Sequence, residues 1–228
     1  QILIVVGDIH GEISQVETLI KTIGFTEDQY LFLGDYIGRG ASSKEVVDCL
    51  VNLSKTNKAI FLCGNHEYYF LDYIKTGNLI DIIDQGGFQT LKSYLKNPHG
   101  NVLDQLRKSI SIDHEIFFSS LKTYWETDDY FFSHSGINPK NIEDRSFESL
   151  VLSNHNLLNH PNEYLKMIVC GHYIQRDFTP KIKNNILFVD TGCGTIGGPL
   201  TAVILPDFQF IQVFPDLSII EGKLVFQN

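Results

Sequence analysis

Cysteine and methionine are scarce in this chain of 228 residues, which holds four cysteines and one methionine. The cysteines (Cys49, Cys63, Cys170 and Cys193) do not follow zinc-ribbon spacing, and Cys63 and Cys170 lie within apolar, strand-like runs. We therefore expect reduced and mostly buried thiols in a cytoplasmic protein rather than a disulfide framework.

Long hydrophobic runs and an excess of positive charge are also missing. No apolar run approaches the roughly 18 residues of a membrane span, and no signal peptide is visible. The 27 acidic and 18 basic residues give a formal net charge of −9, which argues against nucleic acid or an anionic membrane as the main partner. We expect a monomer with neither partner. The chain begins at Gln1 and its only methionine is Met167, so we expect the natural start to lie upstream, and a removed leader stays open.

Apolar strand-like runs alternate with helical patterns in the first part of the chain. Strands are predicted at about 2–6, 30–33 and 58–63, with helices at about 12–23 and 43–53 between them. Such short connections predict three parallel strands joined by right-handed crossovers.

After residue 65 the sequence pattern becomes helical, and after residue 121 it becomes mainly strand-like. Residues 66–121 show helical spacing, and we interpret them as a helical insertion that could wall a cleft. Further on, a helix or two is expected at about 146–166, and strands are expected at 123–126, 130–133, 167–170, 186–190, 200–205, 208–214 and 223–226. The sequence thus predicts one α/β domain over residues 1–228, with two packed β-sheets flanked by helices, the first half parallel and the second mixed or antiparallel.

Polar side chains follow several of these strands where each one ends. They lie in or next to glycine-containing turns such as Gly7-Asp8-Ile9-His10-Gly11 and Gly64-Asn65-His66-Glu67. Ligands of open α/β sheets bind at the carboxyl ends of the strands, so we expect these side chains to meet. The candidates are Asp8, His10, Asp35, Asn65, His66, His134 and His172.

This set offers carboxylate, imidazole and amide ligands without thiolate, which suits manganese, iron or zinc. Six ligands exceed one tetrahedral site but fit two divalent ions that share a carboxylate, a recurring device for displacement at phosphorus with the ions about 3.5–4 Å apart. Each residue alone would more often be a cap, turn or core residue; their shared position favours a site. The other histidines lack this context, and we assign them to the surface or to packing: His99, His114, His155 and His160.

The motifs resemble those of a known family. Gly7-Asp8-Ile9-His10-Gly11, Gly34-Asp35 with Arg39-Gly40, Gly64-Asn65-His66-Glu67, His134-Ser135-Gly136 and Gly171-His172 are similar, in order and spacing, to the five signature motifs of the phosphoprotein phosphatase family of calcineurin-like metallophosphoesterases. The later segments Asp190-Thr191-Gly192-Cys193 and Gly197-Gly198-Pro199-Leu200-Thr201 are similar to those of bacterial and phage-type members and of diadenosine tetraphosphatases.

The resemblance implies a calcineurin-like α/β/β/α sandwich and a ligand for each metal position. Asp8 and His10 would bind the first metal, and Asp35 would bridge the two. The second metal would be bound by Asn65, His134 and His172. Manganese is the expected metal, with iron or zinc as alternatives.

The resemblance also implies roles in catalysis, with a metal-bridging hydroxide as the nucleophile and no phosphoenzyme. Arg39, with Asn65 and His66, would bind the phosphate group. His66 would protonate the leaving group, as a general acid should. Asp35 would be catalytic through the bridged metals, and Glu67 would orient the ligands.

Two positions depart from the family pattern. Gly38 stands where protein phosphatases usually carry the aspartate that pairs with the histidine of Gly-Asn-His-Glu, and diadenosine tetraphosphatases also lack it. The stretch Leu152-Ser153-Asn154 lacks the arginine of a Trp-x-Arg motif, for which Arg145 or Arg176 could substitute.

Several functions stay open at this point. The leading hypothesis is a metal-dependent phosphomonoesterase of the Ser/Thr phosphoprotein phosphatase type, acting on a phosphoprotein or a small phosphorylated substrate. The alternative is a hydrolase of diadenosine tetraphosphate or another dinucleoside polyphosphate. A catalytically weakened module that binds a phosphorylated ligand belongs to a different class, and a complete ligand set argues against it.

Overall fold

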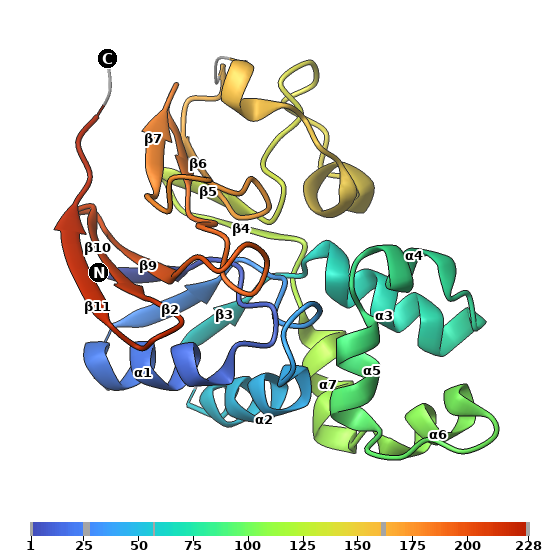
Figure 1. The fold of residues 1–228 in the computed structure, drawn as a ribbon. Helices are drawn as coiled ribbons and strands as arrows, with labels where there is room; N and C mark the ends of the chain where they lie inside the picture. The colour runs from blue at the N-terminus through green and yellow to red at the C-terminus, as the bar shows by residue number, and fades with distance from the viewer. Residues whose placement is uncertain (1, 25–27, 57, 161–162, 227–228) are drawn as a thin grey trace.

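Two β-sheets pack face to face in the computed structural model of the protein, which describes residues 2–24, 28–56, 58–160 and 163–226 (Figure 1). Within these residues the first sheet has six strands in the order β11-β10-β9-β1-β2-β3, and the second has five in the order β4-β5-β6-β8-β7. The strands of the first sheet are β1 (Leu3–Val6), β2 (Gln29–Phe32), β3 (Ala59–Phe61), β9 (Leu200–Leu205), β10 (Gln209–Val213) and β11 (Ile219–Lys223). Those of the second are β4 (Tyr124–Glu126), β5 (Tyr130–Ser133), β6 (Met167–Cys170), β7 (Lys181–Lys183) and β8 (Ile186–Phe188).

The strands β1, β2 and β3 run parallel, as the sequence predicted. Helices α1 (Ile13–Ile23) and α2 (Ser43–Ser54) connect them and cover one face of the sheet (Figure 1). The later strands β9, β10 and β11 continue the sheet in antiparallel pairing. The second sheet is mixed: β5, β6 and β8 are parallel, and β4 and β7 pair antiparallel at its two edges. The predicted fold class is therefore confirmed.

Strand β1 shows why the first apolar run is uninterrupted. Leu3 and Val5 point into the core between the two sheets, where Val5 belongs to the same cluster as Phe132. Ile4 and Val6 alternate to the other face and pack in the cluster that contains the helices. Because both faces of the strand are covered, every residue in it is apolar.

Helices fill the described segment between β3 and β4. They form a group beside the first sheet: α3 (Asn65–Thr76), α4 (Ile80–Asp84), α5 (Phe88–Tyr94), α6 (Val102–Ser109) and α7 (Ile112–Ser120) (Figure 1). The chain then returns to β3, since the N–H of Lys122 donates to the carbonyl of Phe61 at 2.9 Å. That these helices are an insertion into a single domain remains a prediction.

Some boundaries differ from the sequence prediction. The region 146–166 contains only a short π-helix (Glu148–Leu152) and a 3-10 turn (Leu157–Asn159) within its described residues. The last strand is Ile219–Lys223 rather than 223–226, because the turn closed by the N–H of Phe214 and the carbonyl of Ser218 starts the hairpin early. No helix in the described ranges is both long and apolar enough to cross a membrane.

Candidate metal centre

Side chains from both sheets converge where their central strands end. Asp8 and His10 follow β1, Asp35 follows β2, and Asn65 follows β3 as the first residue of α3. The second sheet supplies two histidines, one after β5 and one after β6: His134 and His172. The structure brings all six predicted ligands together.

Asp35 lies at the middle of the group. Its Oδ2 atom is 3.4 Å from Nε2 of His134, 3.7 Å from Nε2 of His10 and 3.9 Å from Nε2 of His66. Two sets of potential ligand atoms, each within 4.8 Å of one another, share this residue. One set is Asp8, Asp35 and His134, and the other is His10, Asp35 and His66. Asp35 belongs to both sets, as a bridging ligand would, whereas the sets separate Asp8 from His10, which were predicted to bind the same ion.

Asn65 and Asp8 complete the centre. The Oδ1 atom of Asn65 lies 3.0 Å from Nε2 of His134 and 3.2 Å from Nδ1 of His172. Asp8 accepts the backbone N–H of His172 at 3.1 Å, and its Oδ2 lies 3.9 Å from Nε2 of His10. Asp8 therefore ties the end of the first sheet to the end of the second.

Backbone conformation aims several of these side chains. His10, Asp35, Arg39 and His172 have φ values of 50°, 52°, 53° and 61°, in the left-handed region. This conformation costs a residue with a Cβ atom about 1–2 kcal/mol, and such strain is concentrated at functional sites. The strained positions of His10, Asp35 and His172 thus lie in the turns whose side chains meet in the centre, whereas Arg39 lies further along the loop after β2 and is exposed.

Glu67 holds the turn that carries Asp35. Its carboxylate accepts the backbone N–H groups of Asp35 and Tyr36 at 2.8 Å and of Ile37 at 3.2 Å. It also accepts the N–H of Gly64 at 2.9 Å. One buried side chain therefore fixes the loops that follow β2 and β3 relative to each other.

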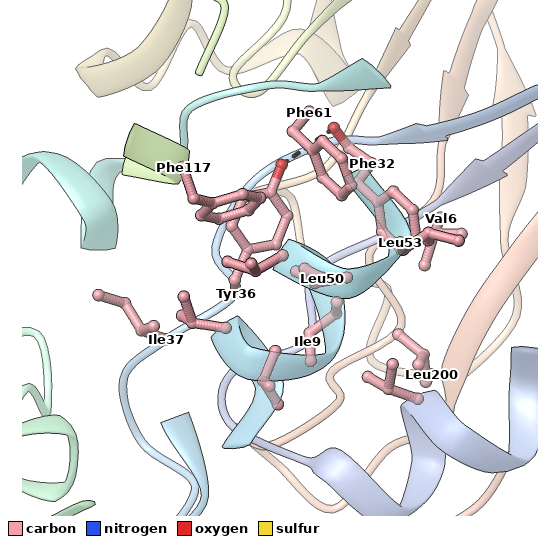
Figure 2. Close-up of a cluster of buried hydrophobic side chains, with 14 of the residues drawn as sticks. Val6, Ile9, Phe32, Tyr36, Ile37, Leu50, Leu53, Phe61, Phe117 and Leu200 are labelled. Carbon is pink, nitrogen blue, oxygen red and sulfur yellow. Dashed lines mark hydrogen bonds between the residues drawn. The ribbon is translucent and has the colours of Figure 1, made fainter. Parts of the chain in front are cut away.

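An aromatic cluster supports the same turn from behind. Tyr36 is fully buried, and its ring lies against those of Phe32, Phe61 and Phe117 (Figure 2). Its hydroxyl donates to the carbonyl of Leu62 at 2.5 Å. The residue next to Asp35 is thereby anchored to β2, β3 and α7.

Asp190 is a buried carboxyl group in the centre to which the sequence analysis assigned no role. It follows β8, accepts the N–H of Gly192 at 2.9 Å, and interacts with the carboxyl of Asp8. Burial raises the pKa of Asp190 to about 6, and burial together with the charge of Asp190 raises the pKa of Asp8 well above its usual value. The position of Asp190 after an apolar strand, two residues before Gly192, is the signal that could have identified it.

The buried carboxylates of the centre would be stabilised by bound cations. Burial would lower the pKa of His134, but the carboxylate of Asp35 outweighs burial and raises it to about 10. Burial likewise would raise the pKa of Asp35, and His134 instead holds it well below its usual value. Divalent ions would neutralise these buried carboxylates, which otherwise must share protons or pair with imidazolium. The oxygen and nitrogen ligands present fit such ions.

The arginines have different environments. Arg39 is exposed, and its backbone N–H donates to the carbonyl of Gly86 at 3.1 Å. Arg145 stacks on the ring of Phe131 at 4.7 Å and donates to the carbonyl of Ile142, so it does not substitute for the missing arginine in this structure. Arg176 is exposed, and no contact within the described residues ties it to the centre.

The remaining histidines lie outside the ligand group, as expected. His114 is buried, with Nδ1 2.8 Å from the hydroxyl of Tyr94 and Nε2 2.8 Å from Oδ1 of Asp48. His155 contacts the carbonyl of Ser149 at 2.7 Å. His99 and His160 make local contacts near their own turns.

Comparison with known proteins agrees with this geometry. The family model described as "Calcineurin-like phosphoesterase" matches residues 3–180. The bis(5'-nucleosyl)-tetraphosphatase PrpE [asymmetrical] of Anoxybacillus flavithermus is 25% identical over 240 residues, covering 92% of each chain. A protein phosphatase 2A catalytic subunit of Dictyostelium discoideum is 42% identical over 66 residues, covering 28% of this chain and 21% of its own. The crystal structure of a "putative diadenosine tetraphosphatase" superposes with a TM-score of 0.64 at 21% identity, covering 99% of this chain and 95% of its own. The chain belongs to the calcineurin-like phosphoesterase family of metal-dependent hydrolases.

Proposed function

We propose that the protein hydrolyses a phosphoanhydride bond in a dinucleoside polyphosphate such as diadenosine tetraphosphate. The observation that carries this proposal is the environment of His66. Its ring lies directly against Gly38, so that a Cβ atom at position 38 would overlap Nδ1 of the imidazole.

None of the described residues that line the small cavity beside His66 carries a carboxyl group that could hold a proton on Nδ1. Among the described residues this small cavity is lined by Ile37, Gly38, His66, Tyr69, Phe70, Ile82, Gln85, Gly87 and Thr90. Burial lowers the pKa of His66 to about 3, and the charge of Asp35 offsets only part of that effect. This environment therefore favours the neutral form of the imidazole.

A neutral His66 restricts the leaving groups that the site can expel. The alkoxide of serine or threonine is a strong base that needs a proton as it departs, which a general acid must supply. A nucleotide leaves as a phosphate oxyanion, a much weaker base that can depart without that proton. The site is accordingly better suited to an anhydride than to a phosphoserine ester.

We assign the ligands as the resemblance implies, with two divalent ions, manganese first among them. Asp8 and His10 would hold one ion and Asp35 would bridge; Asn65, His134 and His172 would hold the other. When bound, such ions supply an acidified water and neutralise phosphoryl charge. Arg39 would bind the phosphate oxygens through its guanidinium fork, and Glu67 would keep Asp35 in place through the contacts described above.

The relatives also favour a dinucleoside polyphosphate over a phosphomonoester as the substrate. The similarity to the tetraphosphatase PrpE runs over nearly the whole chain, whereas that to the phosphatase 2A catalytic subunit is confined to a short segment. The second candidate is a phosphomonoesterase of the Ser/Thr phosphoprotein type, which the higher identity of that segment favours. A cytoplasmic monomer without a nucleic-acid or membrane partner is part of the same proposal.

The test is a side-by-side assay of manganese-reconstituted protein on diadenosine tetraphosphate, a phosphoserine peptide and p-nitrophenyl phosphate. We expect kcat/KM to be highest for the dinucleotide by at least about tenfold. Asp35→Asn serves as the inactive control and excludes a contaminating hydrolase. A preference for the phosphoserine peptide would overturn the proposal in favour of the second candidate.

A further inference from the structure

Three aromatic side chains from two distant segments meet beside the metal centre. Tyr68 and Tyr69 lie on α3, and Phe147 precedes the π-helix. The ring centroid of Tyr68 is 5.4 Å from that of Tyr69 and 5.4 Å from that of Phe147. Tyr68 and Phe147 each remain 37% exposed. We call these three residues the aromatic platform.

Helix geometry directs the two tyrosines toward the centre. Tyr68 follows Asn65 by three residues and Tyr69 follows His66 by three, so each tyrosine neighbours a centre residue on the helix surface. Side chains on a helix lean toward its N-terminus, and the N-terminus of α3 is at the centre. Tyr69 also lines the cavity that contains His66.

Hydrogen bonds also tie the segment after Phe147 to the end of β5, in the second sheet. Ser135, which follows His134, donates its backbone N–H to the carbonyl of Leu150 at 3.0 Å and its hydroxyl to that of Ser149 at 3.2 Å. The segment that carries Phe147 is thus tied to the strand end that carries His134. The aromatic platform therefore bridges the ends of the two sheets next to the phosphate site.

We propose that the aromatic platform binds one nucleobase of the substrate by stacking, an inference that rests on the dinucleoside polyphosphate function proposed above. Every nucleobase offers a flat π-face, and stacking on an aromatic side chain is worth about 1–3 kcal/mol per base. The rings of Tyr68 and Phe147 are too close for a base to enter between them, and their planes are tilted by 47°, so the base would stack on one ring and contact the other at its edge. Because the rings present only phenolic hydroxyls at their edges, adenine and guanine should bind with similar affinity.

Binding measurements test this without relying on turnover. Calorimetry on manganese-loaded protein would compare adenosine monophosphate with inorganic phosphate. Tyr68→Ala and Phe147→Ala should each weaken binding of the nucleotide roughly 5- to 100-fold and leave phosphate affinity within about twofold. Tyr68→Phe keeps the ring and should bind like the wild type.

Phe226→Ala is the matched control for the loss of an exposed aromatic ring. Phe226 is 54% exposed and packs on Phe208, which follows β9 at the opposite end of the first sheet from Asp8. This variant should change neither affinity. Because Tyr68 and Phe147 lie on separate segments, a folding defect in one alanine variant leaves the other as an independent test.

The outcomes separate the two proposals. Hydrolysis of diadenosine tetraphosphate with unchanged KM and unchanged nucleotide affinity in both alanine variants overturns the platform and leaves the proposed function intact. Ring-dependent nucleotide binding without any hydrolysis of the dinucleotide overturns the proposed function and supports the platform as a nucleotide-binding surface. Ring-dependent binding of phosphotyrosine but not of the nucleotide overturns the platform as a base site.

Discussion

The carboxylate of Glu67 accepts the backbone N–H of Asp35 at 2.8 Å, which fixes a buried carboxylate of the candidate metal centre from 32 residues away. The same side chain accepts three further N–H groups, so the loops after β2 and β3 depend on a single acidic residue. The position of Asp35 therefore rests on a side chain that is not itself among the predicted ligands.

Replacing Glu67 should loosen the centre while leaving every ligand in the chain. In Glu67→Gln an amide NH₂ faces N–H donors, and buried donors lose their acceptor at a cost of about 1–3 kcal/mol. We expect manganese affinity and activity to fall roughly 10- to 100-fold, as for other partners that orient ligands. A manganese titration with thermal unfolding measures both effects. The exposed Glu115→Gln should change neither, and wild-type affinity in Glu67→Gln would contradict the assigned role.

Removing metal should abolish activity and lower stability together. Without cations, the buried carboxyls of Asp8 and Asp190 remain close to each other with raised pKa values. Saturation at 100 times the dissociation constant contributes about 2.7 kcal/mol, which raises the melting temperature roughly 5–10 °C for a chain of this size. Chelation should reverse the increase and manganese should restore it. Asp35→Asn should show no metal-dependent shift, whereas the exposed Asp113→Asn should behave like the wild type; turnover that survives thorough chelation would exclude a metal-dependent site.

The pH dependence should differ between substrates according to their leaving groups. Burial lowers the pKa of His66 to about 3, so the protonated, acid-competent fraction is small at neutral pH and grows as the pH falls. The rate on a phosphoserine peptide relative to that on diadenosine tetraphosphate should therefore rise from pH 8 to pH 5, by up to about tenfold per unit. Taking the ratio cancels losses that the two substrates share, such as metal release.

The variant His66→Asn identifies the group responsible for that trend. It should remove the pH dependence of the ratio and should reduce hydrolysis of the peptide more than that of the dinucleotide. His99→Asn, at an exposed site away from the centre, should preserve the trend. A ratio that is flat with pH in the wild type would show that His66 does not act as the acid.

Gly38 should tolerate no side chain. A comparison with Gly100 distinguishes backbone strain from the clash with His66 as the cause. Gly38 has φ +94° and a Cβ atom there would meet the His66 ring, whereas Gly100 has φ +74° and a Cβ atom there would have nothing within 4 Å. Gly100→Ala should cost only the conformational penalty of about 1–2 kcal/mol. Gly38→Ala should add displacement of His66 and a large loss of activity. Gly38→Asp, which would supply the carboxyl group found in protein phosphatases, meets the same obstacle. Equal activities for Gly38→Ala and Gly100→Ala would show that the loop can move.

Much of the candidate centre was predictable because its predicted ligands share one local pattern. Asp8, Asp35 and Asn65 each follow an apolar run and lie beside glycine, and parallel strands bring such positions to one edge. The predicted ligands His134 and His172 follow strands of the other sheet. They could meet the first three only if the two sheets packed with these strand ends together. The sequence grouped them with the first three because they too follow apolar strands, and the motif resemblance agreed with that grouping.

Contacts that depend on packing were not predictable from local patterns. The approach of Asp190 to Asp8 arises because β8 pairs with β6 across the second sheet. The meeting of Phe147 with Tyr68 joins segments far apart in the sequence, and neither segment has a periodicity that indicates the other. The overlap of a Cβ atom at Gly38 with His66 depends on the path of a loop that lies outside the strands and helices.

The left-handed backbone at His10, Asp35, Arg39 and His172 offers a way to recognise decay of this enzyme in divergent sequences. At each position glycine would relieve strain, so these sites keep their side chains against the preference of the fold. A lineage released from the need for catalysis would gain stability by drifting to glycine there while its core strands stayed unchanged. Glycine at these four turns, within an otherwise intact sandwich, would mark a descendant that kept the architecture and lost the chemistry.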